Sequence, residues 1–158
     1  MPQRTPMTQP GFERLQRELD QLKREERPRI IKAIAEARAH GDLSENAEYH
    51  AARERQGFIE TRIGELEAKV SQAEVIAPPQ DGDRVTFAST VRLRGADGKE
   101  VRYQIVGSDE ADPPSGRISV LSPIARTLIG REVGDEVKVQ APGGARTFEI
   151  LAVNFPWE

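Results

Sequence analysis

Apolar residues recur along the first part of the chain at alternating steps of three and four. This spacing is typical of a helix that packs against another helix along a coiled-coil seam. The stripe contains Phe12, Leu15, Leu19 and Leu22, and it resumes at Ile30, Ala33, Ile34 and Ala37. The pattern predicts a helix over residues 8–40. Pro28 lies inside it and predicts a kink or a lost hydrogen bond.

A second stripe with the same alternation covers residues 52–73 and predicts a second helix. The two stripes mirror each other, because facing partners such as Leu15 and Val70 have residue numbers that add up to 85. Two unrelated helices would show this symmetry only by coincidence. The sequence therefore predicts an antiparallel hairpin folded between Asp42 and Leu43, with arms of roughly 45 Å.

Beyond a proline-rich linker the period of the pattern changes to two, which is typical of β-strands. The predicted strands lie at 85–93, 101–105, 118–120, 137–139 and 148–153, with a short helix from Pro123 to Ile129. We therefore predict an α+β protein. Its parts are a helical hairpin (1–76), a linker (77–83) and an antiparallel β domain with one short helix (84–158).

Composition narrows the class of protein. Of 158 residues, 31% are charged and 5% aromatic, and the mean hydropathy is −0.60. The absence of cysteine excludes disulfides and thiolate zinc sites. No apolar run approaches the roughly 20 residues of a membrane-spanning helix, and the N-terminus lacks the apolar stretch of a signal peptide. We expect a cytoplasmic protein without a membrane partner.

Charge argues against a free nucleic-acid-binding module. The net charge is −3. Residues 1–76 carry 13 basic and 14 acidic side chains, and the remainder carries 10 and 12, which together give the 23 and 26 of the whole chain. Neither half has the basic excess needed to neutralise phosphates. If nucleic acid is involved, we expect another molecule to hold it.

The predicted tip of the hairpin carries two carboxylates, Asp42 and Glu45, one helical turn apart. Paired carboxylates can ligate Mg²⁺ or orient a water molecule. The same two residue types at this spacing also form a capping box that opens a helix. Two carboxylates alone hold Mg²⁺ poorly, because the ion requires near-octahedral oxygen ligation. A catalytic role would therefore need a partner that supplies the other ligands.

The run from Ala37 to Glu54, ARAHGDLSENAEYHAARE, resembles the signature of the bacterial Gre transcript cleavage factors. The segments Arg27–Ile31 and Ser122–Gly130 also match that family, and the resemblance extends from about Met7 to Val153. Around Glu45–Arg53 the residues are more similar to GreA-type than to GreB-type members.

This resemblance implies a function. In the family, an FKBP-like C-terminal domain docks on RNA polymerase, and the hairpin enters the secondary channel of the polymerase. The matching acids, here Asp42 and Glu45, would share an Mg²⁺ with the polymerase and position water, so that the polymerase cleaves the nascent RNA of a backtracked complex at its displaced 3′ end. The protein would then be an accessory factor and not an enzyme by itself. We also expect it to be a monomer.

Five further residues are candidates for contact with RNA or polymerase. Arg38 and Arg53 match arginines of the family's basic patch, although helix-surface arginines also serve solubility, and a cation is favoured near a helix C-terminus. Tyr49, Ser44 and Asn46 could touch RNA or polymerase. For Ser44 and Asn46 an equally good explanation is their preference for a helix start.

Three other functions stay open at this point: a channel-binding inhibitor without cleavage activity, a structural adaptor with a capped turn, and a prolyl isomerase. Intact Asp42 and Glu45 argue against the inhibitor, and the scarcity of aromatic residues argues against the isomerase. In the β domain we expect the polymerase contact to involve Asp109, Glu110, Asp112 and Pro123, from their position in loops.

Overall fold

The computed structural model describes residues 4–41 and 46–157. By their contacts these residues form two units. One is helical and runs from Phe12 to Ala73. The other combines Arg4–Gly11 with the chain from Glu74 onward. The inclusion of Arg4–Gly11 in the second unit was not indicated by the sequence. In the part of the chain that the structure describes, no helix is both long and apolar enough to cross a membrane.

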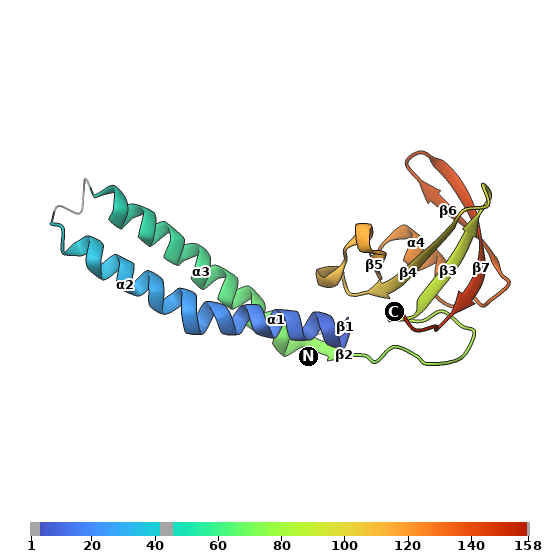
Figure 1. Ribbon diagram of the computed structural model, residues 1–158, viewed down its shortest axis with the longest axis horizontal. Helices are drawn as coiled ribbons and strands as arrows, with labels where there is room; N and C mark the ends of the chain where they lie inside the picture. Colours follow the sequence, from blue (N-terminus) through green and yellow to red (C-terminus); the bar gives the residue numbers. More distant parts are fainter. Residues whose placement is uncertain (1–3, 42–45, 158) are drawn as a thin grey trace. The chain divides into compact units, whose positions relative to one another are not determined.

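The helical unit is the predicted antiparallel hairpin (Figure 1). Its first arm consists of α1 (Gln9–Gln21), a π-helical turn (Leu22–Glu26) and α2 (Arg27–Arg38). Its second arm is one α-helix, α3 (Ala47–Gln72), which runs back beside α2. The buried residues lie on the two predicted stripes: Leu15, Ile34, Ala37, Ala52, Ile59, Ile63 and Leu66.

The π-helical turn accompanies Pro28. The Arg27 N–H donates to the Leu22 carbonyl, five residues back instead of the usual four. Pro28 then stands in the first turn of α2, a position that tolerates a residue without an N–H. In a regular α-helix the ring of Pro28 would meet the carbonyl of Arg24, four residues earlier. The disturbance predicted at Pro28, a lost hydrogen bond or a kink, is therefore observed as one wide turn.

The wide turn also brings the two parts of the first arm into phase. Leu15 and Ile34 are nineteen residues apart (34 minus 15), so an unbroken α-helix, at about 100° per residue, would place them about 100° apart around its axis. A π turn winds one additional residue into a single turn. About eighteen α-helical steps, or five full turns, then separate them. Both are buried, with 8% of each exposed, as expected for two residues on one face of the arm.

Ion pairs tie the arms together along the hairpin. The guanidinium of Arg62 on α3 donates to both carboxylate oxygens of Glu18 on α1, at 2.8 and 2.9 Å. Arg27 makes the same two-bonded contact with Glu60, at 2.8 Å for each bond. The hydrogen bond from Arg62 lowers the pKa of the Glu18 carboxyl, while its partial burial opposes the shift. The bond to Glu18 in turn raises the pKa of Arg62.

Replacing Glu18 with glutamine should destabilise the hairpin only at pH values where Glu18 is ionised. A carboxyl with a lowered folded-state pKa contributes stability above its unfolded pKa and loses it as the pH falls through the folded pKa. Because the pair is partly exposed, we expect Glu18→Gln to cost a few tenths to about 1 kcal/mol at pH 7. Urea unfolding at pH 7 and pH 3 tests this, with Glu36→Gln as control. A Glu18→Gln cost that is as large at pH 3 would contradict it.

The second unit contains a five-stranded sheet in the order β5-β4-β3-β7-β6. Adjacent strands are antiparallel except for β4 and β5, which are parallel. The strands are β3 (Thr90–Gly95), β4 (Glu100–Val106), β5 (Arg117–Ser119), β6 (Glu136–Ala141) and β7 (Gly144–Val153). The predicted α+β class is confirmed, with a mainly antiparallel sheet.

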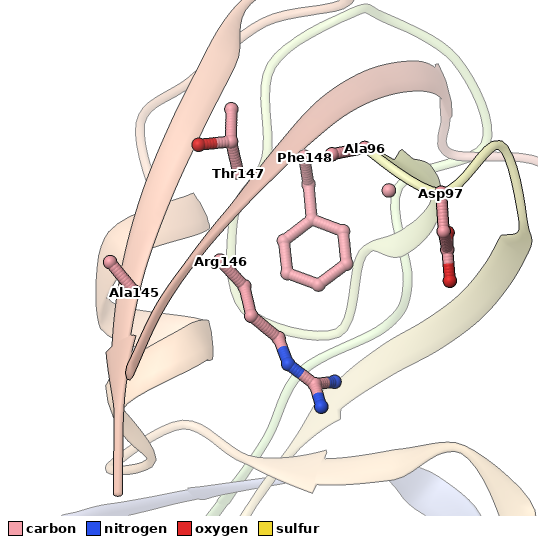
Figure 2. Close-up of a pocket in the computed structure, with 7 residues that line it drawn as sticks. Ala96, Asp97, Ala145, Arg146, Thr147 and Phe148 are labelled. Atoms are coloured by element: carbon pink, nitrogen blue, oxygen red, sulfur yellow. The ribbon is translucent and has the colours of Figure 1, made fainter. Parts of the chain in front are cut away.

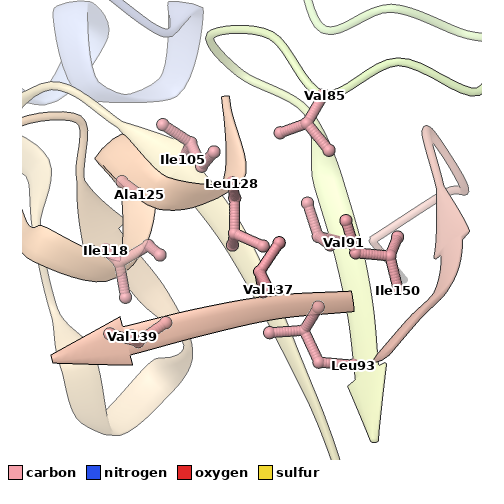
Figure 3. Close-up of a cluster of buried hydrophobic side chains, with 10 residues drawn as sticks. All are labelled: Val85, Val91, Leu93, Ile105, Ile118, Ala125, Leu128, Val137, Val139 and Ile150. Carbon is pink, nitrogen blue, oxygen red and sulfur yellow. The ribbon is translucent and has the colours of Figure 1, made fainter. Parts of the chain in front are cut away.

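The core of this unit lies between the sheet and α4 (Pro123–Leu128), as Figure 3 shows. Ser122 caps α4, since its hydroxyl accepts a hydrogen bond from the Ala125 N–H at 3.2 Å. Leu128 and Ala125 of α4 are fully buried. The sheet and the loops beside it contribute Val85, Val91, Leu93, Ile105, Ile118, Val137, Val139 and Ile150.

The strand predicted for residues 85–93 is partly wrong. β3 begins only at Thr90, and the chain turns between Thr86 and Ser89, whose hydroxyl accepts from the Thr86 N–H at 2.9 Å. Within this turn Ala88 has a φ of +71°, a left-handed conformation that is uncommon outside glycine. Val85, directly before this turn, and Phe87 within it still reach the core. Their alternation therefore reflects burial without strand geometry.

A separate two-stranded sheet pairs β1 (Thr5–Met7) with β2 (Ala73–Val75). Directly after β2, the Ile76 N–H donates to the Met7 carbonyl at 2.9 Å. The Met7 side chain is 1% exposed. Thr5–Met7 are therefore held against the segment that leaves the second helix.

The N-terminal segment of this unit is also anchored to a buried carboxylate. Glu110 is 6% exposed and accepts hydrogen bonds from the Thr8 and Gly107 N–H groups, each at 2.9 Å, as well as from the Thr8 hydroxyl. A side chain at Gly107 would come within 2.7 Å of the Pro6 carbonyl oxygen. The expectation that Glu110 is an exposed loop residue, on which its predicted polymerase contact rests, is therefore wrong, because its oxygens are bound inside the unit.

Candidate functional site

The described ends of the hairpin arms flank the segment that carries Asp42 and Glu45. α2 ends at Arg38, and Gly41 has a φ of +106°, with its N–H donating to the Arg38 carbonyl at 3.2 Å. This left-handed glycine closes the helix as predicted. α3 begins at Ala47, and Asn46 is its N-cap. Its side-chain oxygen accepts from the Tyr49 N–H at 3.0 Å.

The observed start of α3 corrects one prediction, that a capping box at Asp42 opens the second helix. α3 begins at Ala47, five residues after the predicted cap (47 minus 42). Asparagine ranks with aspartate as an N-cap, so the local pattern allowed either position. Because Asn46 already meets the need for a cap on α3, capping of this helix does not explain the acids at positions 42 and 45.

Two predicted contact residues lie beside each other near these helix ends. The guanidinium carbon of Arg38 is 5.9 Å from the centre of the Tyr49 ring, within the range of a cation–π contact. The Tyr49 ring also meets His50 edge to face at 5.5 Å. A second contact between the arms at this end joins His40 to Glu48 at 3.6 Å. Arg38 is exposed and Tyr49 is half-buried.

The structure also brings the two predicted arginines together. Arg38 on α2 and Arg53 on α3 line one shallow hollow of about 420 Å³. Ile31, which is 51% exposed, lines the same hollow. Both arginines are exposed. Two cations on one face near the tip are suited to contact with phosphate groups.

Asp42, Ser44 and Glu45 lie outside the described residues, so their predicted roles stay predictions. Within residues 4–41 and 46–157, no group of three or more histidine, cysteine, aspartate or glutamate side chains is placed to hold a metal ion. The donor types at 42 and 45 suit Mg²⁺, but two carboxylates are too few to hold it alone. An Mg²⁺ site at the tip therefore needs ligands from another molecule.

One hollow of the β domain, beside its β3–β4 turn, offers little that suits a prolyl isomerase. This hollow of about 400 Å³ lies beside the β3–β4 turn and the β6–β7 hairpin, and Figure 2 shows the residues that line it. Among the described residues, Phe148 is the one aromatic residue in its lining, and none from 122–130 lines it. The carboxylate of Asp97 at its edge accepts from the Lys99 N–H at 2.9 Å. Of the residues expected to contact polymerase, Asp109, Asp112 and Pro123 are not buried.

Comparison with known proteins accounts for both halves of the chain. Residues 5–75 match the family model described as "Transcription elongation factor, N-terminal", and residues 79–155 match "Transcription elongation factor, GreA/GreB, C-term". The chain belongs to the GreA/GreB family of transcription elongation factors. The predicted family is therefore confirmed, and its process is transcription elongation.

Two GreA proteins are similar to the chain over nearly its whole length. The chain is 62% identical to the transcription elongation factor GreA of Acidiphilium cryptum over 155 residues, which cover 97% of this chain and 99% of the relative. It is 59% identical to GreA of Agrobacterium fabrum, with coverage of 98% and 99%. Among solved structures it is similar to the GreA factor homolog Gfh1 of Thermus thermophilus, with 30% identity, coverage of 96% and 99%, and a TM-score of 0.44.

Proposed function

We propose that this protein enters the secondary channel of bacterial RNA polymerase with its hairpin tip and stimulates cleavage of backtracked nascent RNA. The observation that carries the proposal is the family match over both halves of the chain, together with intact acids at positions 42 and 45. In the proposal the β domain docks on the polymerase, and the protein acts as an accessory factor in the cytoplasm.

The acids Asp42 and Glu45 are the proposed oxygen ligands that this chain contributes to an Mg²⁺ held mainly by the polymerase. A bound Mg²⁺ of this kind activates water and neutralises charge on the phosphate that is cleaved. Arg38 and Arg53 would hold the displaced RNA by its phosphates. Support comes from their common hollow and exposure on the hairpin.

The capping of α3 by Asn46 supports a chemical role for the acids. The main alternative explanation for Asp42 and Glu45 was a capping box at the start of the second helix. The observed cap of α3 is Asn46. The presence of two carboxylates at the tip is then better explained by use in a partner's active site.

Backtracked polymerase complexes with 5′-labelled RNA test this function. On addition of the protein we expect the RNA to shorten at its 3′ end and to be extended again when nucleotides are supplied. A protein that slows elongation and leaves the RNA uncut would instead be a channel-binding inhibitor. A protein without effect on either reaction would contradict both functions.

A further inference from the structure

The side chain of Asn46 bonds to the main chain of both hairpin arms. Its oxygen accepts from the Tyr49 N–H in the first turn of α3, at 3.0 Å. Its amide nitrogen donates to the Ala37 carbonyl in the last turn of α2, at 2.6 Å. The Ala37 carbonyl also accepts from the His40 N–H at 3.2 Å. One half-buried amide thus joins the end of one helix to the start of the next.

These two bonds satisfy complementary needs. The first turn of a helix leaves N–H groups without partners, and the last turn leaves carbonyls without partners. A primary amide carries an acceptor and a donor on two different atoms in a rigid plane. An aspartate offers acceptors only, and a serine has a single oxygen. Asparagine is therefore suited to bridge the helix ends as well as to cap one of them.

We infer that Asn46 is a positioning residue, which fixes the spacing of the two helix ends on either side of Asp42 and Glu45. This inference rests on the proposed function, because it assigns the bridge a role in presenting those acids to the polymerase. Arg38 with Tyr49, and His40 with Glu48, also join the arms here. Only the Asn46 bridge, among these three contacts, ends on main-chain atoms in both helices. Both polar groups of its amide are engaged, which favours positioning over contact with RNA.

The substitution Asn46→Asp separates bridging from capping. Aspartate caps helices as well as asparagine does, but it replaces the donor that faces the Ala37 carbonyl with a second acceptor. We expect the maximal rate of stimulated RNA cleavage to fall about tenfold to a hundredfold, since small displacements of catalytic groups have effects of this size. The concentration for half-maximal stimulation should change less than about twofold, because the polymerase-docking surface is unaltered.

Asn46→Ser is the matched second variant, since serine also caps well but cannot reach both partners, and it should lose activity similarly. An Asn46→Asp protein that cleaves like the wild type would overturn the inference, as would a defect confined to the half-maximal concentration.

Hydrogen exchange supplies a readout apart from cleavage: Asn46→Asp should speed exchange of the His40 and Gly41 amides while residues 52–66 stay protected. If the wild type stimulates no cleavage, the proposed function fails, and unchanged exchange would then overturn the bridge as well.

Discussion

Replacing Asp42 with asparagine, or Glu45 with glutamine, is expected to reduce stimulated RNA cleavage about a hundredfold or more at saturating protein. A hundredfold loss corresponds to about 2.7 kcal/mol of transition-state stabilisation. Each substitution removes a negative charge while keeping the size of the side chain. An amide oxygen is a weaker ligand for Mg²⁺ than a carboxylate. The loss should therefore appear in the cleavage step itself.

Labelled RNA in backtracked complexes gives the cleavage rate for each variant. Binding can be followed by competition, in which an inactive variant should suppress the wild-type reaction with an affinity similar to that of the wild type. Circular dichroism should show unchanged helicity, because α3 is capped by Asn46. If both carboxamides cleave as fast as the wild type, the acids have no part in the chemistry.

Glu54→Gln is the matched control for charge. Glu54 is an exposed carboxylate on α3, two helical turns after the start of that helix and near the same end of the hairpin. Its substitution removes one negative charge without altering the tip acids, so cleavage should change little. The double variant at 42 and 45 should lose hardly more than either single variant, since groups that act as a unit are strongly non-additive.

The start of α3 shows what the local sequence can predict and what it cannot. Asp42 with Glu45 fits a capping box, and Asn46 fits a single-residue cap; both are good local signals. The deciding feature is the hydrogen bond from Asn46 to Ala37 on the other arm. That bond exists only once the hairpin has formed, so residue preferences near position 46 could not reveal it.

The burial of Glu110 could not be predicted from the local sequence either, because its partner Thr8 is distant in the chain. A glutamate in a loop is normally exposed, and this expectation led to its assignment as a contact residue. Its bonds to Thr8 join residues 102 positions apart. By contrast, the apolar stripes of the hairpin and the alternation in β4, β6 and β7 were sufficient to predict those elements. Their periodicity records which side is buried.

Pro28 predicted a disturbance of the first arm. The spacing of the apolar stripe indicates which kind of disturbance occurs. Leu22 and Ile30 are eight residues apart (30 minus 22), one more than a heptad. An extra residue in a heptad pattern must be absorbed by a change in helical winding. The π-helical turn at Leu22–Glu26 does this. The eight-residue step was therefore a usable signal for the wide turn.

Deletion of one residue from this turn should be tolerated if Pro28 is replaced as well. Deleting Arg24 leaves Leu15 and Ile34 eighteen residues apart, which keeps them in phase along a continuous α-helix of about 100° per residue. Pro28 would then lie inside that helix at a cost of about 3 kcal/mol. We expect the Arg24 deletion alone to be destabilised by about that amount, and the deletion with Pro28→Ala to regain wild-type stability. Thermal unfolding followed at 222 nm measures the change.

Deletion of Thr61 from α3 is the matched control. Thr61 is exposed, like Arg24, but α3 is one regular helix without an additional residue. Its loss rotates Ile59 by about 100° relative to Ile63 and Leu66, so at least one buried side chain must leave the interface. Exposing one such side chain costs about 1.5–3 kcal/mol. If the Arg24 deletion with Pro28→Ala is as unstable as the Thr61 deletion, the wide turn does not set the phase of the arm. If the Thr61 deletion is unstable and the Arg24 deletion with Pro28→Ala is not, the additional residue is specific to the first arm, and the π turn is what keeps both parts of that arm in phase.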